Sequence, residues 1–188
     1  MANYVLFISE NKLKDSTAIG GNVDMEFILP YIRTAQKKYI EYLLGTDLFS
    51  KLQSDITAGS LSGVYQTLVD DYIQDCLIHY SFYEAFPFLR HKIMNNNVVS
   101  KTAENAETLS REEAQDLREE IRNTAEFYGE RLVRYLKNNT SSYPEYSTNT
   151  GADVSPSKEA FYTGMNLEDT RHGQGKLTLD DFLTADLL

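Results

Sequence analysis

The chain has 188 residues, and the 41% that are hydrophobic are enough to build one buried core, so disorder throughout is not expected. Its 28 acidic and 18 basic residues leave a formal net charge of −10, which argues against binding nucleic acid by neutralising its phosphates. The only cysteine, Cys76, excludes an internal disulfide and a multi-cysteine zinc cluster and fits a reducing cytosol. No apolar run reaches the roughly 18 to 20 residues of a spanning helix and no signal-peptide pattern is visible, so we expect a soluble protein without a membrane partner.

The first part of the chain predicts a short strand followed by a helix. The run Tyr4 to Ile8 is rich in β-branched and aromatic residues and reads as a strand. From Asp24 the pattern becomes helical, and Pro30 either starts a helix or kinks one already begun. Gly45 should end this helix. Its apolar residues recur at helical spacing, at Ile32, Ala35, Tyr39 and Leu43.

A second helix should follow at once and form a hairpin with the first. Leu48, Leu52 and Ile56 lie one above another at i, i+4 and i+8, and the helix should close in the turn at Gly59.

The third helix is expected from about Val64 towards Ile93. Its first half is amphipathic, but from Phe82 to Leu89 large apolar residues point nearly all round. We expect this second half to be the centre of the core, buried by other helices or by another subunit, with Pro87 bending or breaking the helix.

The next segment predicts a small β-hairpin and then a fourth, long helix. Asn95-Asn96-Asn97 is a turn signal, and Val98-Val99 would form one arm. Ser110 and Glu113 form an S-x-x-E capping box, which marks the start of a helix that should continue to about Lys137.

After residue 140 the composition becomes polar and loses any sustained period. We therefore expect a mainly α fold: a bundle of about four helices, two short and two long, in a domain spanning 1–140, with a short N-terminal strand and a small β-hairpin. Residues 141–188 are expected to be an extended C-terminal tail. Apolar anchors punctuate this tail at Phe161, Tyr162, Leu179, Phe182, Leu183 and Leu187.

No catalytic, cofactor-binding or metal-binding set is predicted. Cys76 and His79 could share a helical face, but neither has an evident orienting partner, so an inert buried thiol is the expected reading. His79, His91 and His172 lack the i, i+4 spacing of a helical metal site. The pattern is that of a protein that binds and not of an enzyme.

Several stretches resemble a known family. Asn22-Val23-Asp24, Leu43-Leu44-Gly45-Thr46 and Leu48-Phe49 resemble the first helical hairpin of head-to-tail connector proteins of tailed bacteriophages, particularly the ring or adaptor proteins of crAss-like phages. Ala125-Glu126-Phe127-Tyr128 and Tyr135-Leu136 look like their last long helix. The resemblance covers about residues 1–140 and departs from the family in the long tail and in Phe86-Pro87.

The resemblance implies a structural protein of the virion neck, assembled in the cytoplasm of the host bacterium. Copies, commonly twelve, would form a ring beneath the portal protein, seat the next neck or tail ring, and let DNA pass through the channel without specific binding. A closed ring needs a heterologous interface, in which one patch of the chain meets a different patch of the next copy. The residues expected at such interfaces are Tyr4, Leu6, Ile8, Phe82, Phe86, Phe88, Phe161, Tyr162, Leu179, Phe182, Leu183 and Leu187.

Two other classes stay open from the sequence. One is a cytosolic α-helical scaffold or regulatory module that binds a partner through its tail. The other is a small hydrolase whose catalytic site is not evident in the sequence, and a loss of activity in Cys76→Ala would have to be shown to support it.

Overall fold

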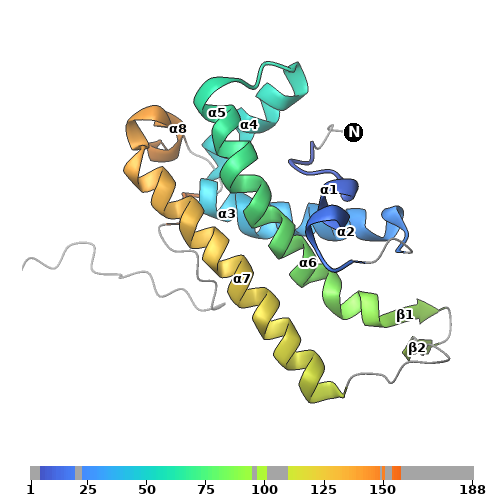
Figure 1. The fold of residues 1–188 in the computed structure, drawn as a ribbon. Coiled ribbons are helices and arrows are strands. Elements are labelled where there is room, and N and C mark those ends of the chain that lie inside the picture. The colour runs from blue at the N-terminus through green and yellow to red at the C-terminus, as the bar shows by residue number, and fades with distance from the viewer. Residues whose placement is uncertain are drawn as a thin grey trace, which may run out of the picture.

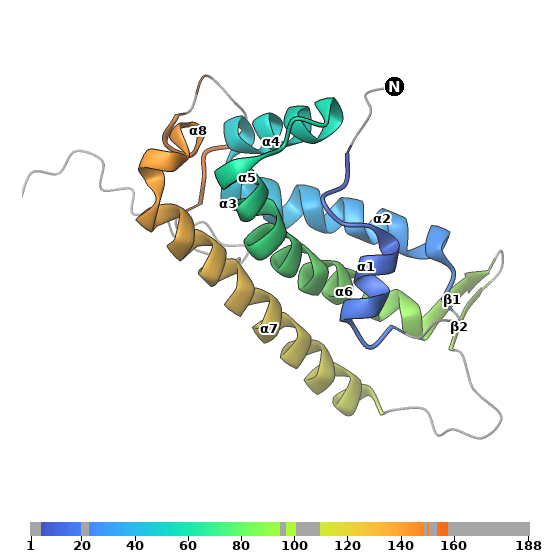
Figure 2. The same cartoon turned by 45° about the horizontal axis from the view of Figure 1, so that its top comes forward.

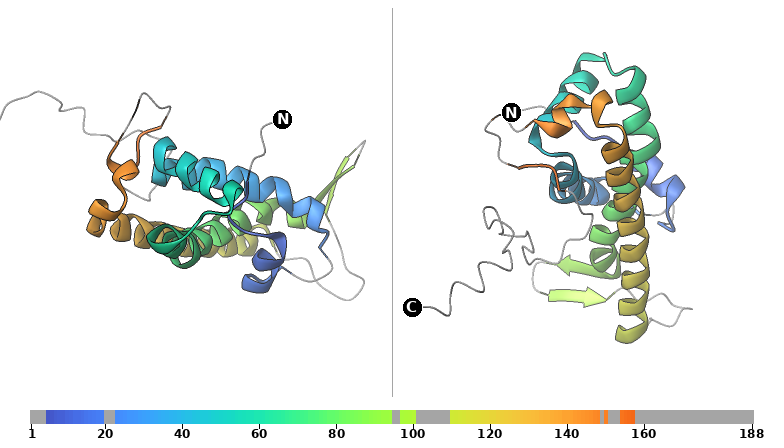
Figure 3. Two further views of the ribbon diagram at one scale, coloured as in Figure 1. Left: turned by 90° about the horizontal axis from the view of Figure 1, so that it is seen from above. Right: turned by 90° about the vertical axis from the view of Figure 1, so that its left-hand side faces the viewer.

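The computed structural model describes residues 5–19, 23–94, 97–100, 110–148, 150 and 154–157, and within these ranges the protein is mainly α-helical (Figure 1). The expected helical bundle is confirmed. Among the described residues, three long helical runs pack together. The middle run has α2 (Met25–Ala35) on one side and α7 (Arg111–Asn138) on the other (Figures 1 and 2). In the view from above in Figure 3, the first run lies to one side of the middle run and α7, which overlap in that view.

The first long run consists of α2 (Met25–Ala35), the π-helical turn η1 (Gln36–Ile40) and α3 (Glu41–Leu44). The Asp24 side chain caps its start by accepting a hydrogen bond from the Glu26 backbone N–H at 3.2 Å. Pro30 lies inside α2 with its ring exposed, so a helix start at this residue is wrong. Gly45, with a φ of 77°, ends the run as expected.

Helix α4 (Thr46–Ala58) follows directly and ends at Gly59, which has a left-handed φ of 66°. The expected turn is therefore confirmed. The two helices meet at the corner between α3 and α4, and the N-terminal segment lies between η1 and α4, where Phe7 packs on Phe49 with ring centroids 5.3 Å apart.

The middle run consists of α5 (Gly63–Leu68), the π-helical turn η2 (Val69–Ile73) and α6 (Gln74–Arg90). The helix passes through Pro87, so the expected break there is wrong. The core centre is also earlier than predicted. The fully buried residues of this run lie between Leu68 and Ala85, whereas Phe82 and Phe86 are half-buried and Phe88 is 38% exposed.

Strands β1 (His91–Met94) and β2 (Asn97–Ser100) form the expected antiparallel hairpin, with His91 opposite Ser100. Helix α7 (Arg111–Asn138) then packs along α6. The capping box is present in full: Glu113 N–H donates to Ser110 Oγ at 3.2 Å, and Ser110 N–H donates to the Glu113 carboxylate at 2.9 Å.

The packed structure continues past the expected boundary at residue 140. The turn η3 (Thr140–Ser142) and α8 (Pro144–Ser147) follow α7, and Tyr143 between them is fully buried. The Tyr143 hydroxyl donates to the Val64 carbonyl at 2.9 Å and lies 3.0 Å from the Tyr135 hydroxyl. Tyr143 thus closes one end of the bundle.

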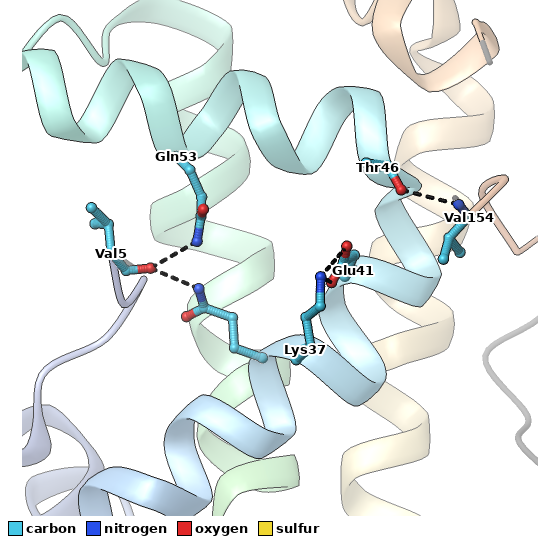
Figure 4. Close-up of polar contacts among 7 residues, drawn as sticks. Val5, Lys37, Glu41, Thr46, Gln53 and Val154 are labelled. Atoms are coloured by element: carbon cyan, nitrogen blue, oxygen red, sulfur yellow. Dashed lines mark hydrogen bonds and ion pairs between the residues drawn. The ribbon is translucent and has the colours of Figure 1, made fainter. Parts of the chain in front are cut away.

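Residues 154–157 return to the corner between α3 and α4. Thr46 N–H donates to the Val154 carbonyl at 3.0 Å, and Val154 N–H donates to the Thr46 hydroxyl at 3.1 Å (Figure 4). Ser157 N–H donates to the Tyr42 carbonyl at 3.0 Å. The remaining tail, 158–188, lies outside the described residues.

Candidate functional site

The N-terminal segment, residues 5–8, contains no strand, so that prediction is wrong. Side-chain amides take the place of a strand partner. Gln36 accepts the Phe7 N–H at 2.9 Å and donates to the Val5 carbonyl at 2.8 Å. Gln53 donates to the same carbonyl at 3.1 Å (Figure 4), and Gln74 donates to the Phe7 carbonyl at 3.0 Å.

This network buries residues that were expected at an interface. Ile8 is only 4% exposed and belongs to the core, and Leu6 is half-buried against it. The backbone of Phe7 already has both hydrogen bonds, so it cannot add a strand to another sheet while this network holds. Tyr4 lies outside the described residues.

An aromatic patch is exposed where α2 meets the end of α6. We define it as Phe27, Tyr31 and Phe88. Tyr31 stacks on Phe88 with centroids 5.0 Å apart, and Phe27 packs on Tyr31 at 5.6 Å. Phe27 is 40% exposed although it belongs to this cluster. Of these three residues, only Phe88 was predicted to lie at an interface. The i, i+4 spacing of Phe27 and Tyr31 places them side by side on one helix and could have indicated the other two.

A second exposed aromatic residue lies on α7. Phe127 is 63% exposed and contacts the ring of Tyr128 edge-on at 5.4 Å. It lies outside the buried stripe of α7, which includes Ala125 and Leu132. The signal for this position was an aromatic residue outside the apolar period of its helix. Helices α2 and α7 lie on opposite sides of α6 (Figure 2), so Phe127 on α7 and the two α2 residues of the aromatic patch belong to different flanks.

A cleft of about 490 Å³ separates the last turns of α6 from the first turns of α7. Phe86 lines this cleft, and its ring packs edge-on against that of Phe82 with centroids 6.2 Å apart. Of these two predicted interface residues, Phe86 therefore lies in the cleft and Phe82 lies beside it. The opposite wall carries Arg111, Arg118 and Arg122. The predicted interface residues Phe161, Tyr162, Leu179, Phe182, Leu183 and Leu187 lie outside the described residues.

The Cys76 and His79 pair is arranged as core packing. Cys76 is fully buried, and burial raises the pKa of its thiol, which disfavours the nucleophilic thiolate. Burial lowers the pKa of His79, whose ring stacks on Tyr128 at 4.7 Å. This environment does not activate the thiol.

The described part of the chain contains neither a metal-binding cluster nor a membrane-spanning helix. Within it, no group of three or more His, Cys, Asp or Glu side chains could hold a metal ion. No helix there combines the length and the apolar character needed to cross a membrane.

The fold and its surfaces define a helical bundle with exposed aromatic side chains and a cationic cleft. The chain belongs to a family that is described as a family of unknown function, DUF6712, whose profile matches residues 40–156. The match starts at the end of η1 and reaches Pro156, so it includes the returning segment that packs on Gly45. No curated protein and no solved structure matches the chain.

Proposed function

We propose that this protein is a structural subunit of the virion neck of a tailed bacteriophage, where copies form a ring between portal and tail. The proposal starts from the resemblance to connector proteins in the two hairpin helices and the last long helix. The observation that carries it further is the exposure of large aromatic side chains on two flanks of one bundle, the aromatic patch and Phe127.

Two different patches are what a ring requires. A heterologous contact joins unlike surfaces of successive copies and closes when the rotation between them divides a full turn. Aromatic residues are the usual anchors of protein interfaces because they bury a large area at little entropic cost. Phe88 and Phe127 are our proposed anchors.

The charge of the chain suits a conduit for DNA. A net charge of −10 gives a wall that repels phosphate, so the genome would pass without being held. The portal protein would lie on one side of the ring and the next neck or tail ring on the other.

The test uses the purified full-length chain, with light scattering after size exclusion and negative-stain microscopy, alone and with the portal protein encoded in the same genome. We expect rings, or a collar bound to the portal. A persistent monomer or dimer that ignores the portal would favour the scaffold module instead.

Interface variants sharpen this test. Phe88→Ser and Phe127→Ser should each prevent ring closure, whereas Val64→Ser, at a residue that is exposed on α5, should not. Each variant keeps the surface that the other lacks. An equimolar mixture of the two should therefore form a heterodimer that cannot add further subunits. Rings in both single variants would overturn the proposed interface.

A further inference from the structure

The cleft between α6 and α7 combines an apolar wall with a cationic wall. Tyr83, Phe86 and Pro87 of α6 form the apolar wall. The guanidinium of Arg118 lies 4.7 Å from the centre of the Tyr83 ring, which places a cation over the aromatic face. The cleft can therefore receive a ligand that is both apolar and anionic.

The positive charge of this cleft is local. Arg111, Arg118 and Arg122 are spaced by seven and four residues and so lie on one face of α7. Among the lining residues that the structure describes, Glu119 is acidic and three are arginines, of which Arg122 is already ion-paired with Glu126 at 3.5 Å while Arg111 and Arg118 face the cleft. All three arginines are exposed, in a chain whose net charge is −10.

The end of the chain has the complementary composition. Residues 179–187 contain three aspartates and no basic residue. Four large apolar residues recur at i, i+3, i+4 and i+8, which is the spacing of one helical face. A helix of this length is marginal alone and needs a surface to fold against. The apolar residues are Leu179, Phe182, Leu183 and Leu187, and the acids are Asp180, Asp181 and Asp186.

We propose that residues 179–187 dock as a short amphipathic helix in the α6–α7 cleft of the same chain. Their apolar face would pack on Tyr83 and Phe86, and their aspartates would pair with Arg111 and Arg118. This inference concerns the single subunit and does not depend on ring formation.

The tether is long enough for this docking. Ser157 is fixed to Tyr42 at the corner between α3 and α4, and residues 158–179 supply 22 residues from there. Such a segment spans up to about 70 Å when extended, and roughly 25 Å on average as a flexible coil. Helix α7, with 28 residues, is about 42 Å long, so its first turns are within reach. A tether of this length gives an effective concentration near the millimolar range, which favours the chain's own tail over a second copy.

The experiment places a spin label on the tail and measures nuclear relaxation in the full-length chain. Thr184→Cys provides the attachment point, because the native Cys76 is fully buried and does not compete for the label. We expect strong broadening of the amide signals of Ala114 and Arg118 and none at Leu136, near the other end of α7.

Charge variants identify the contact. Arg118→Glu should lower the docked fraction about fivefold, because an attraction becomes a repulsion. Arg134→Glu is the matched control: it also lies on α7 and also loses one surface contact, its ion pair with Glu130 at 3.1 Å. Asp180→Arg combined with Asp181→Arg should restore docking to the Arg118→Glu chain.

Three results would overturn the proposal. The label could leave the signals of residues 111–122 unchanged, or Arg118→Glu could have no more effect than Arg134→Glu. The third result comes from a mixture of spin-labelled chains without isotope enrichment and isotope-enriched chains without a label. Broadening of the amide signals of the cleft in this mixture would show that the tail of a second copy occupies it.

Discussion

The two ends of the bundle are built differently. At the corner between α3 and α4, later parts of the chain return and close the surface: Asp47 accepts hydrogen bonds from Thr148 and Thr150, and Val154 pairs with Thr46. The other end is where α6 runs into β1 and where α7 begins (Figure 1). There the aromatic patch and the arginine cleft are open to solvent.

The packing of the middle run against α7 also differs between the two ends. Near the closed end, Tyr72 of η2 stacks on Tyr135 of α7 with centroids 3.9 Å apart. Towards the other end a cleft separates α6 from α7. We infer that the closed end supplies most of the stability, while the open end supplies the aromatic patch and the arginine cleft.

The largest expected effect is at the closed end. Tyr143→Ala should lower the free energy of unfolding by about 3 to 5 kcal/mol, since it leaves a cavity and removes two hydrogen bonds. Phe127→Ala, at an exposed position past the middle of α7, should change it by less than about 0.5 kcal/mol because most of the side chain is already in water. Urea unfolding followed by circular dichroism measures both.

Tyr143→Phe separates packing from hydrogen bonding at this position. It keeps the ring and should cost only about 1 to 2 kcal/mol, through the Val64 carbonyl left without its donor. Equal losses in the Phe and Ala variants would contradict the packing role.

Gly45→Ala should cost about 3 kcal/mol. Gly45 has a φ of 77° and a ψ of 158°, a backbone region that side chains avoid, and an added Cβ would lie 2.7 Å from Pro156. Gly59→Ala is the matched control: its φ of 66° is also positive, but a Cβ there would meet nothing within 4 Å, so it should cost about 1 kcal/mol. A similar cost for both would show that the returning segment does not constrain this corner.

Gln36→Ala should cost about 2 kcal/mol, because it leaves the buried Phe7 N–H without an acceptor. Hydrogen exchange at Phe7 should become much faster. Gln66→Ala, at an exposed position on α5, should change neither stability nor exchange. Unchanged protection of Phe7 in Gln36→Ala would contradict the role of this amide.

Features set by nearby residues were predictable from the sequence. The capping box of Ser110 and Glu113 and the turns at Gly45 and Gly59 depend only on residues within a few positions. Apolar spacing also gave the long helices, although it could not detect the π-helical turns η1 and η2.

Features that join distant parts of the chain were not predictable. Three glutamines from three separate helices converge on residues 5–8, and no local pattern distinguishes them from surface glutamines. Phe82 to Leu89 looked like the core centre because periodicity counts apolar residues without showing which neighbour covers them. The aromatic patch, which joins α2 to the end of α6, was missed in part for the same reason.

The smallest expected effect is a difference in acid sensitivity at the closed corner. The Thr150 backbone N–H, with the hydroxyls of Thr150 and Thr148, holds the pKa of Asp47 below its ordinary value. A carboxyl whose pKa is lower in the folded state stabilises the fold above its unfolded pKa, and that contribution disappears as the pH falls through the folded pKa. Below about pH 4, the free energy of unfolding should therefore fall less steeply in Asp47→Asn than in the natural chain.

Glu113 at the open end is the control, because the Ser110 N–H lowers the pKa of its carboxyl. Glu113→Gln should lose a similar acid-sensitive contribution to stability without loosening residues 148–157. Proteolysis within that segment at neutral pH should then increase in Asp47→Asn alone, and equal cleavage of both variants would contradict the role of Asp47 in holding it.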